Sequence, residues 1–322
     1  MRVTHGAALA GLPPVALTIG NFDGVHKGHQ AMLARVIREA RARQLQSCVL
    51  TFEPHPREFF ERMRMRPSNG SPPGQAPTRL SSLREKLELI ENFGIARTHI
   101  ERFSKRFAAL EPEAFVEQVL VKVLRARWVL VGDDFRFGAK RAGDTALLRK
   151  LGAAAGFEFE VMEPVLLDGM RVSSGAVRRA LAEGALAHSE ALLGRPYSIS
   201  GRVVHGDKLG RELGFSTANI QMKHNRPPLT GVFAVRLHGA GMEPLSGVAS
   251  LGVRPTIKSG GTAVLEVHLF DFSGELYGRH VRVDFLHKLR EEEKYPDLET
   301  LRAQIARDCE AARAYHREKR RA

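Results

Sequence analysis

The sequence predicts a doubly wound α/β domain followed by a small antiparallel β-barrel that carries a terminal helix. Up to about residue 185, short apolar segments alternate with helical patterns, which is typical of a parallel sheet covered by helices. After Gly194 the helical periodicity ends, and short β-type segments separated by glycine turns follow. The chain of 322 residues is long enough for two domains of ordinary size. We therefore expect one domain over residues 1–186 and another over residues 187–322.

Four short apolar runs predict buried strands in the first half of the chain, namely Val15–Ile19, Cys48–Phe52, Trp128–Val131 and Phe157–Val161. Five helices are predicted over residues 32–40, 83–90, 112–124, 144–156 and 174–184. Ser82 and Glu85 form a capping box, and Pro112 suits a first helical turn. Asp144 and Gly156 suit the two ends of one helix. In such a sheet, ligands bind at the carboxyl ends of the strands.

Five β-type segments predict the strands of the second domain, and a helix follows them. The segments are Tyr197–His205, Gly231–Leu237, Gly247–Val253, Leu265–Phe270 and Val281–Leu286. From Asp297 onward, apolar residues recur at helical spacing and predict the terminal helix. One further segment, Arg62–Thr78, breaks the alternation of the first domain with methionine, arginine, proline and glycine residues. We expect a surface loop there, either a tolerated insertion or a lid over a ligand.

The charge balance is strongly basic, since 49 lysines and arginines face 36 aspartates and glutamates, for a net charge of +13. This balance favours polyanionic partners (nucleic acid, anionic membranes or polyphosphate substrates) without choosing among them. Cys48 and Cys309 form neither a CxxC pair nor a disulfide framework, so we expect a cytoplasmic protein. No apolar run is long enough to span a membrane, and Pro13 and Pro14 interrupt the mildly apolar N-terminus. Neither a membrane partner nor a signal peptide is therefore expected.

A glycine- and histidine-rich stretch directly follows the first predicted strand. Gly20 and Gly24 allow tight turns close to a ligand, and Gly28 begins a helix whose free N–H groups can hold phosphate. His26 and His29 are three residues apart, so on a first helical turn they share one face. Two imidazoles there could hydrogen-bond an α-phosphate and its leaving pyrophosphate. A zinc-binding pair and two unrelated surface histidines are the alternatives.

This stretch resembles the HxGH signature of the nucleotidyltransferase superfamily, and the preceding Gly20–Gly24 resembles its flavin-nucleotide adenylyltransferase branch. Three later segments, 52–56, 132–144 and 172–178, resemble further motifs of that branch. The resemblance implies a Rossmann-like nucleotidyltransferase domain. The last motif usually contains Ser-Ser-Thr, whereas this chain has Gly175 in place of the threonine. A hydroxyl contact is then missing or is supplied by a neighbouring serine.

The resemblance also implies which residues act in the first domain. It assigns catalysis to His26, His29 and Arg178. It assigns nucleotide and phosphate binding to Gly20, Phe22, Asp23, Gly24, Gly28, Ser173 and Ser174. It assigns flavin binding to His55, Pro56, Asp134, Phe135 and Phe137. From the residues alone, simpler roles stay open: aspartates that cap a turn, serines that cap a helix, an exposed arginine, and phenylalanines that fill the core.

A second glycine-rich segment, Gly206–Asn219, is predicted to be a loop, and it is basic and rich in hydroxyl groups, as a triphosphate and Mg²⁺ site requires. It is not a Walker A motif, because no Gly-Lys-Ser/Thr ends it. With the residues before it, the segment resembles the riboflavin kinase signature, whose core is Gly-Arg-x-Leu-Gly-Phe-Pro-Thr-Ala-Asn. This chain has Ser216 where that signature has proline. Gly231–Phe233 and Leu265–Phe272 resemble two strands of the same family.

Both halves together resemble the bacterial bifunctional riboflavin kinase and FAD synthetase family. The resemblance implies that ATP phosphorylates riboflavin to FMN in the second domain and adenylylates FMN to FAD in the first. It implies ATP as a substrate and Mg²⁺ at both active sites, with riboflavin, FMN and FAD as the other partners. The implied nucleotide and phosphate ligands of the second domain are Gly206, Lys208, Gly210, Arg211, Gly214, Thr217 and Asn219. Of these, Thr217 and Asn219 are also the implied metal ligands.

Glu266 is the implied general base, which takes the proton of the riboflavin 5′-hydroxyl. On a strand, Glu266 and His268 point to the same side, so His268 is geometrically able to assist. A solvated strand glutamate and a structural histidine are the alternatives.

Three other classes of function compete with this interpretation. The net charge of +13 and the basic C-terminal tail favour a nucleic-acid-binding protein. However, aromatic residues make up only 7% of the chain, and no RRM, KH or helix-turn-helix signature occurs. We therefore expect no specific nucleic-acid partner. A nucleotidyltransferase with another substrate and a flavin sensor with inactive sites are the other two classes. The sequence makes no prediction of the oligomeric state.

Overall fold

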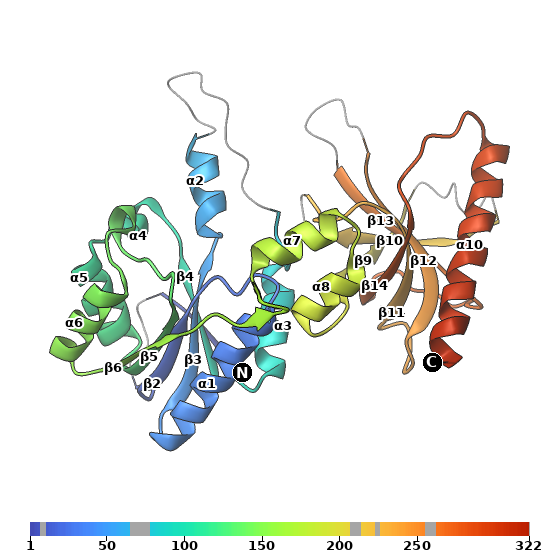
Figure 1. Cartoon of the computed structure of the whole chain (residues 1–322). Coiled ribbons are helices and arrows are strands. Elements are labelled where there is room, and N and C mark those ends of the chain that lie inside the picture. Colours follow the sequence, from blue (N-terminus) through green and yellow to red (C-terminus); the bar gives the residue numbers. More distant parts are fainter. Residues whose placement is uncertain (7–10, 65–77, 207–213, 223–225, 255–261, 322) are drawn as a thin grey trace. The chain divides into compact units, whose positions relative to one another are not determined.

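The computed structural model describes residues 1–6, 11–64, 78–206, 214–222, 226–254 and 262–321 (Figure 1). The chain forms two compact units. The first consists of residues 1–77 and 83–172, and the second of residues 78–82 and 173–322. Within the described residues, no helix has both the length and the apolar character needed to cross a membrane.

A six-stranded parallel sheet forms the centre of the first unit. In spatial order the strands are β1 (Arg2–His5), β4 (Arg97–Arg102), β3 (Gln46–Glu53), β2 (Val15–Ile19), β5 (Ala126–Gly132) and β6 (Glu158–Met162). The predicted doubly wound sheet is confirmed, and the four predicted apolar runs lie in β2, β3, β5 and β6. The strand order reverses between β2 and β5. Ligands of open α/β sheets bind at such a switch point.

Strands β1 and β4 escape prediction from the sequence because their side chains are mostly polar. In β4, the side chains of Arg97, Thr98 and His99 are nevertheless buried. His99 Nδ1 lies 3.1 Å from the hydroxyl oxygen of Thr4, and Arg97 donates a hydrogen bond to the Leu124 carbonyl at 3.3 Å. Buried polar groups are tolerated where such hydrogen bonds form. Strand β4 is therefore buried although its sequence contains no apolar run.

Helices cover both faces of this sheet (Figure 1). The α- and π-helices of the described residues in this unit are α1 (Lys27–Ala42), α2 (Pro56–Arg64), α3 (Leu83–Asn92), α4 (Lys105–Ala108), α5 (Pro112–Phe115), which continues as a π-helix over 116–123, and α6 (Thr145–Ala155). Of these, α2 projects beyond the carboxyl end of β3 and does not cover a face (Figure 1). Alternate residues of β2 point to opposite faces, so Leu17 and Ala16 join different core clusters. The Leu17 cluster includes residues of α5, the π-helix and α6, whereas the Ala16 cluster includes residues of α1 and α3.

Several predicted helix ends are confirmed. Asp144 caps α6 by accepting a backbone hydrogen bond at 2.9 Å, and Gly156 ends this helix with a φ of 75°. Pro112 occupies the first position of α5. The expectation of a loop from Arg62 onward is wrong at its start, because residues 62–64 continue α2. Residues 65–77 of that expected loop lie outside the described residues.

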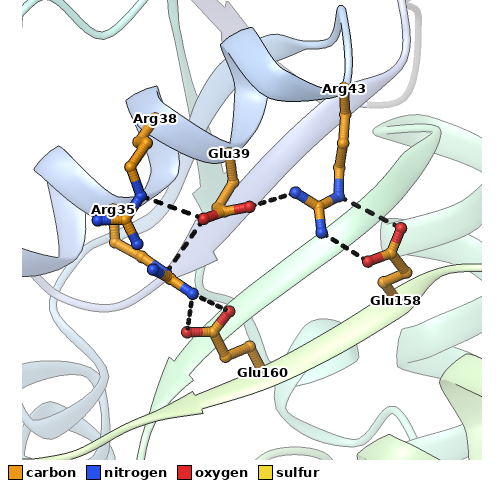
Figure 2. A network of polar contacts seen from close by, with 6 residues as sticks. All are labelled: Arg35, Arg38, Glu39, Arg43, Glu158 and Glu160. Carbon is orange, nitrogen blue, oxygen red and sulfur yellow. Dashed lines mark hydrogen bonds and ion pairs between the residues drawn. The ribbon is translucent and has the colours of Figure 1, made fainter.

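Ion pairs join α1 to the edge strand β6 (Figure 2). Arg43 lies between two carboxylates, since it is bonded to Glu39 on its own helix and, at 2.7 Å, to Glu158 on β6. About two helical turns before Arg43, Arg35 lies 3.4 Å from Glu39 and 3.0 Å from Glu160. The hydrogen bonds from Arg43 lower the pKa of Glu158.

Glu158→Gln is expected to lower the free energy of unfolding of the first unit by less than about 1 kcal/mol, because exposed ion pairs contribute little. Arg43 lowers the pKa of Glu158, so the contribution exists above the ordinary carboxyl pKa and is lost as the pH falls through the lowered value. Urea unfolding of both proteins at neutral pH and in acid measures this difference. A loss above about 2 kcal/mol, or one that persists in acid, would contradict the prediction.

A closed antiparallel barrel forms the centre of the second unit. Around the barrel, its strands are β10 (Thr217–Met222), β13 (Thr262–Leu269), β12 (Leu245–Arg254), β11 (Gly231–His238), β14 (His280–Arg290) and β9 (Tyr197–Val204). The helices of this unit among the described residues are α7 (Ser174–Ala182), α8 (Leu186–Leu193) and α10 (Leu298–Arg321). Cys309 and Ala312 of α10 share a core cluster with Val232, Ala234 and Val248 of the barrel. The predicted barrel and its terminal helix are therefore confirmed.

Strand β10 corrects one expectation, because Thr217 and Asn219 were expected in a loop. They lie on a strand that pairs antiparallel with β9 and β13. Ile220 is the one fully buried residue of this strand. The apolar residues Ala218, Ile220 and Met222 alternate along this strand, but the pattern is short and directly follows a glycine-rich segment, so the sequence analysis missed the strand.

Gly201 of β9 marks a close approach between neighbouring strands. A Cβ atom at this position would lie 2.3 Å from the carbonyl oxygen of Gln221. Gly201→Ala is therefore expected to shift the strand and destabilise the barrel by about 1–3 kcal/mol, as overpacking commonly does. Thermal unfolding measures the effect, with Gly241→Ala as control because its Cβ would meet no atom within 4 Å. Equal melting temperatures for the two variants would contradict this expectation.

Candidate active sites

A strained turn joins the carboxyl end of β2 to α1. Phe22 and Val25 have left-handed backbone angles, with φ of 50° and 42°, although neither is glycine. The Val25 N–H donates to the Phe22 carbonyl at 3.3 Å. Non-glycine residues in such conformations cost about 1–3 kcal/mol each, and this strain collects at functional sites. The Phe22 side chain is fully buried, so only its backbone is available to a nucleotide.

The predicted histidine pair comes together at the start of α1. The helix begins at Lys27, one residue earlier than expected, so His26 is its N-cap and lies just before the first turn. His26 Nδ1 accepts a hydrogen bond from the His29 N–H at 3.3 Å, and the two rings stack with their centres 3.7 Å apart. His26 is 7% exposed, so the alternative of two surface histidines is wrong. Among the described residues, no group of three His, Cys, Asp or Glu is placed to hold a metal ion, which leaves the zinc alternative without support.

The surroundings of His29 favour a neutral imidazole. Burial lowers the pKa of His29 well below its ordinary value, and the neighbouring charges of His26 and Lys86 lower it further. His29 Nδ1 and the side-chain oxygen of Asn21 are buried and have no hydrogen-bond partner among the described residues. A neutral imidazole still donates one N–H, and the first turn of α1 presents free backbone N–H groups beside it. The start of α1 is thus suited to bind phosphate groups.

The second and third motifs follow β3 and β5, at the carboxyl end of the sheet. His55 and Pro56 stand at the start of α2, and His55 Nδ1 accepts a backbone hydrogen bond at 3.1 Å. Asp134 is exposed and lies 3.3 Å from Arg171, which also binds Asp133 at 2.7 Å. The aspartates are therefore held by an ion pair with the short strand β8 (Met170–Arg171) of the hairpin that it forms with β7 (Leu166–Leu167).

Two phenylalanines of the third motif have different surroundings. Phe135 and Phe137 stack with their ring centres 5.6 Å apart. Phe137 is 5% exposed and belongs to the core cluster of Leu17, as the core-filling alternative expects. Phe135 is half-buried at the edge of that cluster. Of the two rings, only Phe135 has exposed surface to offer a flavin.

The fourth motif begins at the last residue of the first unit, Val172, and continues from Ser173 in the second unit. Ser173 is the N-cap of α7, and its hydroxyl accepts a hydrogen bond from the Ala176 N–H at 3.2 Å. Arg178, one turn later, donates from Nε to the Thr78 carbonyl at 2.6 Å. A Cβ atom at Gly175 would lie 3.6 Å from the Ser173 hydroxyl, which is an ordinary contact. The departure at Gly175 therefore leaves the cap intact.

A cavity of about 630 Å³ opens on the barrel and is lined by residues of β10, β12 and β13. Strand pairing places Asn219 beside Glu266, and Glu266 beside Ser250. Thr217 and His268 form the next cross-strand pair and also line the cavity. Directly paired side chains on one face of a sheet lie close together. An amide, a carboxylate and hydroxyl groups thus form one polar surface across three strands.

Hydrogen bonds fix the rim of this cavity. His268 Nδ1 donates to the Ser216 carbonyl at 2.9 Å, which gives this histidine the structural role that was one of its alternatives. The Ser250 hydroxyl donates to Glu292 at 2.8 Å. Glu292 follows β14, and no sequence motif had indicated it. Apolar side chains complete the lining, among them Val232, Val248, Leu298, Leu301 and Ile305.

The oxygen atoms that line the barrel cavity are suitable ligands for Mg²⁺. Mg²⁺ prefers oxygen ligands and is bound by one or two protein groups together with water and substrate phosphates. The Thr217 hydroxyl, the Asn219 amide oxygen and the Glu266 carboxylate are such oxygens, and all three residues line one cavity. Asn219 packs closely on Gly206, where a Cβ atom would lie 2.2 Å from its amide nitrogen. The remaining predicted phosphate ligands, Lys208, Gly210 and Arg211, lie outside the described residues, whereas Gly214 ends the gap with a φ of 89°.

Known proteins resemble this chain over both units. The FAD synthetase family matches residues 10–176, and the riboflavin kinase family matches residues 193–316. The bifunctional riboflavin kinase/FMN adenylyltransferase of Escherichia coli K12 is 46% identical over 315 residues, which cover 98% of this chain and 97% of that protein. The chain belongs to the bifunctional riboflavin kinase/FMN adenylyltransferase family.

A further relative and a solved structure are similar to the chain over most of its length. The bifunctional riboflavin kinase/FMN adenylyltransferase of Pseudomonas fluorescens is 47% identical over 297 residues, which cover 92% of this chain and 91% of that protein. A solved structure described as a macrolide-efflux protein from Streptococcus pneumoniae superposes with a TM-score of 0.81 at 26% identity, covering 97% of this chain and 99% of that one. The two matched families follow each other along the chain in the predicted order.

Proposed function

We propose that this chain phosphorylates riboflavin to FMN in its second domain and adenylylates FMN to FAD in its first. One observation carries the proposal: polar residues suited to phosphate chemistry come together within each matched family region. The histidine pair at the start of α1 lies within residues 10–176, and the pairing of Asn219 with Glu266 lies within residues 193–316. ATP is the phosphoryl donor of the first reaction and the adenylyl donor of the second.

In the kinase step, the 5′-hydroxyl of riboflavin attacks the γ-phosphorus of ATP, and ADP leaves. Glu266 accepts the hydroxyl proton, and Thr217 and Asn219 on the neighbouring strand bind the phosphates. Mg²⁺, when bound by Thr217 and Asn219, neutralises charge on the phosphate oxygens. The apolar lining of the cavity suits the flavin ring and excludes water from it.

In the adenylyl-transfer step, a phosphate oxygen of FMN attacks the α-phosphorus of ATP, and pyrophosphate leaves. No protein nucleophile is needed, so the residues act by binding and by stabilising charge. His26 and His29 hydrogen-bond the reacting phosphates, together with the backbone N–H groups at Gly28. From the fourth motif we also assign Arg178 to catalysis and Ser173 and Ser174, at the start of α7, to phosphate binding.

The remaining assignments of the first domain follow the motifs. We assign the turn Gly20–Gly24, with the backbone of Phe22 and with Asp23, to nucleotide binding. We assign flavin binding to His55, Pro56, Asp134 and Phe135, whereas the predicted flavin contact of Phe137 is given up because this ring is buried in the core. A Mg²⁺ ion is proposed here as well, because the unpartnered side-chain oxygen of Asn21 is a ligand of the kind it prefers.

The domain boundary and the compartment are parts of the same proposal. We place the adenylyltransferase domain at residues 1–186 and the kinase domain at 187–322, since the two family matches end at 176 and begin at 193. Both cysteines are free and buried, which agrees with a reducing cytoplasm. No specific nucleic-acid partner is proposed, because two ATP-binding sites account for a need for basic residues.

The products released by each step test the proposal. With riboflavin, ATP and Mg²⁺, one ADP is expected for each FMN formed. With FMN in place of riboflavin, one pyrophosphate is expected for each FAD formed, and no ADP. ADP release in the second reaction, or the absence of pyrophosphate, would overturn the assigned chemistry.

A further inference from the structure

A buried lysine lies beneath the turn that leads into α1. Lys86 belongs to α3 and is only 5% exposed. Its Nζ lies 3.1 Å from the carbonyl oxygen of Asn21 and 3.2 Å from the hydroxyl of Thr51. The same hydroxyl lies 3.3 Å from the Asn21 carbonyl oxygen. Lysine is rarely buried, and burial of an ammonium group is costly unless polar partners surround it.

The held carbonyl belongs to the residue just before the strained part of the turn. Asn21 precedes Phe22, whose φ is 50°, and Val25 follows with a φ of 42°. Strained backbone persists only where surrounding contacts fix it. The ammonium group and the Thr51 hydroxyl both bind the Asn21 carbonyl, so they fix the start of this turn. The end of the turn is His26, the N-cap of α1.

The charge of this lysine also acts on the histidine pair. The positive charge of Lys86 contributes, after burial and His26, to the lowered pKa of His29. A fixed cation that lowers this pKa by repulsion attracts negative charge at the same place. In adenylyl transfer, negative charge develops on the phosphates that His29 is proposed to bind. A cation already held in position stabilises such charge without reorganisation during the reaction.

We propose that Lys86 is a positioning residue of the adenylyl-transfer site, which fixes the Asn21–Val25 turn and supplies a fixed positive charge behind the bound phosphates. This inference rests on the function proposed above for the first domain. It adds a residue from a helix that none of the sequence motifs includes.

Lys86→Met in the full chain removes the charge and the hydrogen bonds to Asn21 and Thr51 while keeping much of the side-chain volume. We expect kcat for FMN adenylylation to fall about 10- to 100-fold, the factor that corresponds to losing a hydrogen bond from a charged group. KM for FMN is expected to stay within about threefold, because the positioned groups act mainly on the transition state. Lys86→Arg is expected to recover most of the lost kcat, since it restores a charged donor. Lys150→Met, at an exposed lysine of α6, is the matched control.

A second readout separates this role from a merely structural one. The imidazole of His29, assigned by comparison with His29→Ala, is titrated by NMR in the wild type and in Lys86→Met. Its pKa is expected to rise in the variant, because one of the causes that lower it is removed. If Lys86→Met does not fold, the kcat of Thr51→Val decides instead. A loss of kcat is expected in this variant, because the Thr51 hydroxyl no longer donates to the Asn21 carbonyl.

The inference would be overturned if Lys86→Met adenylylated FMN with the kcat of the wild type, or if the pKa of His29 were the same in both proteins. In the fallback case, wild-type kcat in Thr51→Val would overturn it. Failure of the proposed function has a different result, since the wild-type chain itself would then form no FAD from FMN. Loss of activity in His29→Ala with full activity in Lys86→Met rejects only the role of Lys86.

Discussion

Replacing His29 with alanine is expected to abolish FMN adenylylation while riboflavin phosphorylation continues. His29 stacks on His26 at 3.7 Å at the start of α1, and its neutral ring has an N–H to donate to phosphate. Removal of one such donor to developing negative charge commonly lowers kcat by about 100- to 1,000-fold. Riboflavin phosphorylation is expected to stay unchanged because it uses side chains of β10 and β13. The measurement is the rate of FAD formation from supplied FMN, beside the rate of FMN formation from riboflavin.

His5→Ala is the matched control, since this histidine is exposed at the end of β1 in the same unit. It is expected to leave both rates at the wild-type level. An equal loss of both activities in a folded His29→Ala protein would contradict the division of labour between the two domains. Full adenylylation by this variant would remove His29 from the site altogether.

Replacing Glu266 with glutamine is expected to stop riboflavin phosphorylation, while supplied FMN is still converted to FAD. Glutamine keeps the size of the side chain and its neighbours Asn219 and Ser250, but it cannot accept the hydroxyl proton. Loss of a general base commonly costs about 100- to 10,000-fold in rate. The measurement is the initial rate of FMN formation, with the FMN-to-FAD rate recorded on the same sample.

The exposed Glu243, in the connection between β11 and β12, is the control position for this variant. Glu243→Gln is expected to phosphorylate riboflavin normally. Retained kinase turnover in Glu266→Gln would refute the base assignment and would favour the alternative of a solvated strand glutamate.

The sequence predicts the fold best where burial is apolar and continuous. Val15–Ile19 is buried at every position, and it appears as strand β2 with the predicted bounds. Strand β4 is buried as well, but through Arg97, Thr98 and His99, whose burial depends on hydrogen bonds from distant residues. Strand β10 contains a single fully buried residue, so its pairing with β13 decides its conformation more than its own apolar pattern does.

The sequence predicts the sites best where a motif is local. The proximity of His26 and His29 follows from their spacing, although His26 proves to be an N-cap. Lys86 and Glu292 could not be found in the same way. Each reaches its site from a segment far along the chain, through contacts with Asn21 and with Ser250 that only the fold brings about.

The central claim is that one chain makes FMN at one site and FAD at the other. The most direct test is a time course of the full chain with riboflavin, ATP and Mg²⁺, in which the flavins are separated by chromatography. We predict that FMN appears first and that FAD follows as FMN is consumed. FMN that is never converted would contradict an active first domain. The absence of any phosphorylated flavin would contradict the account as a whole.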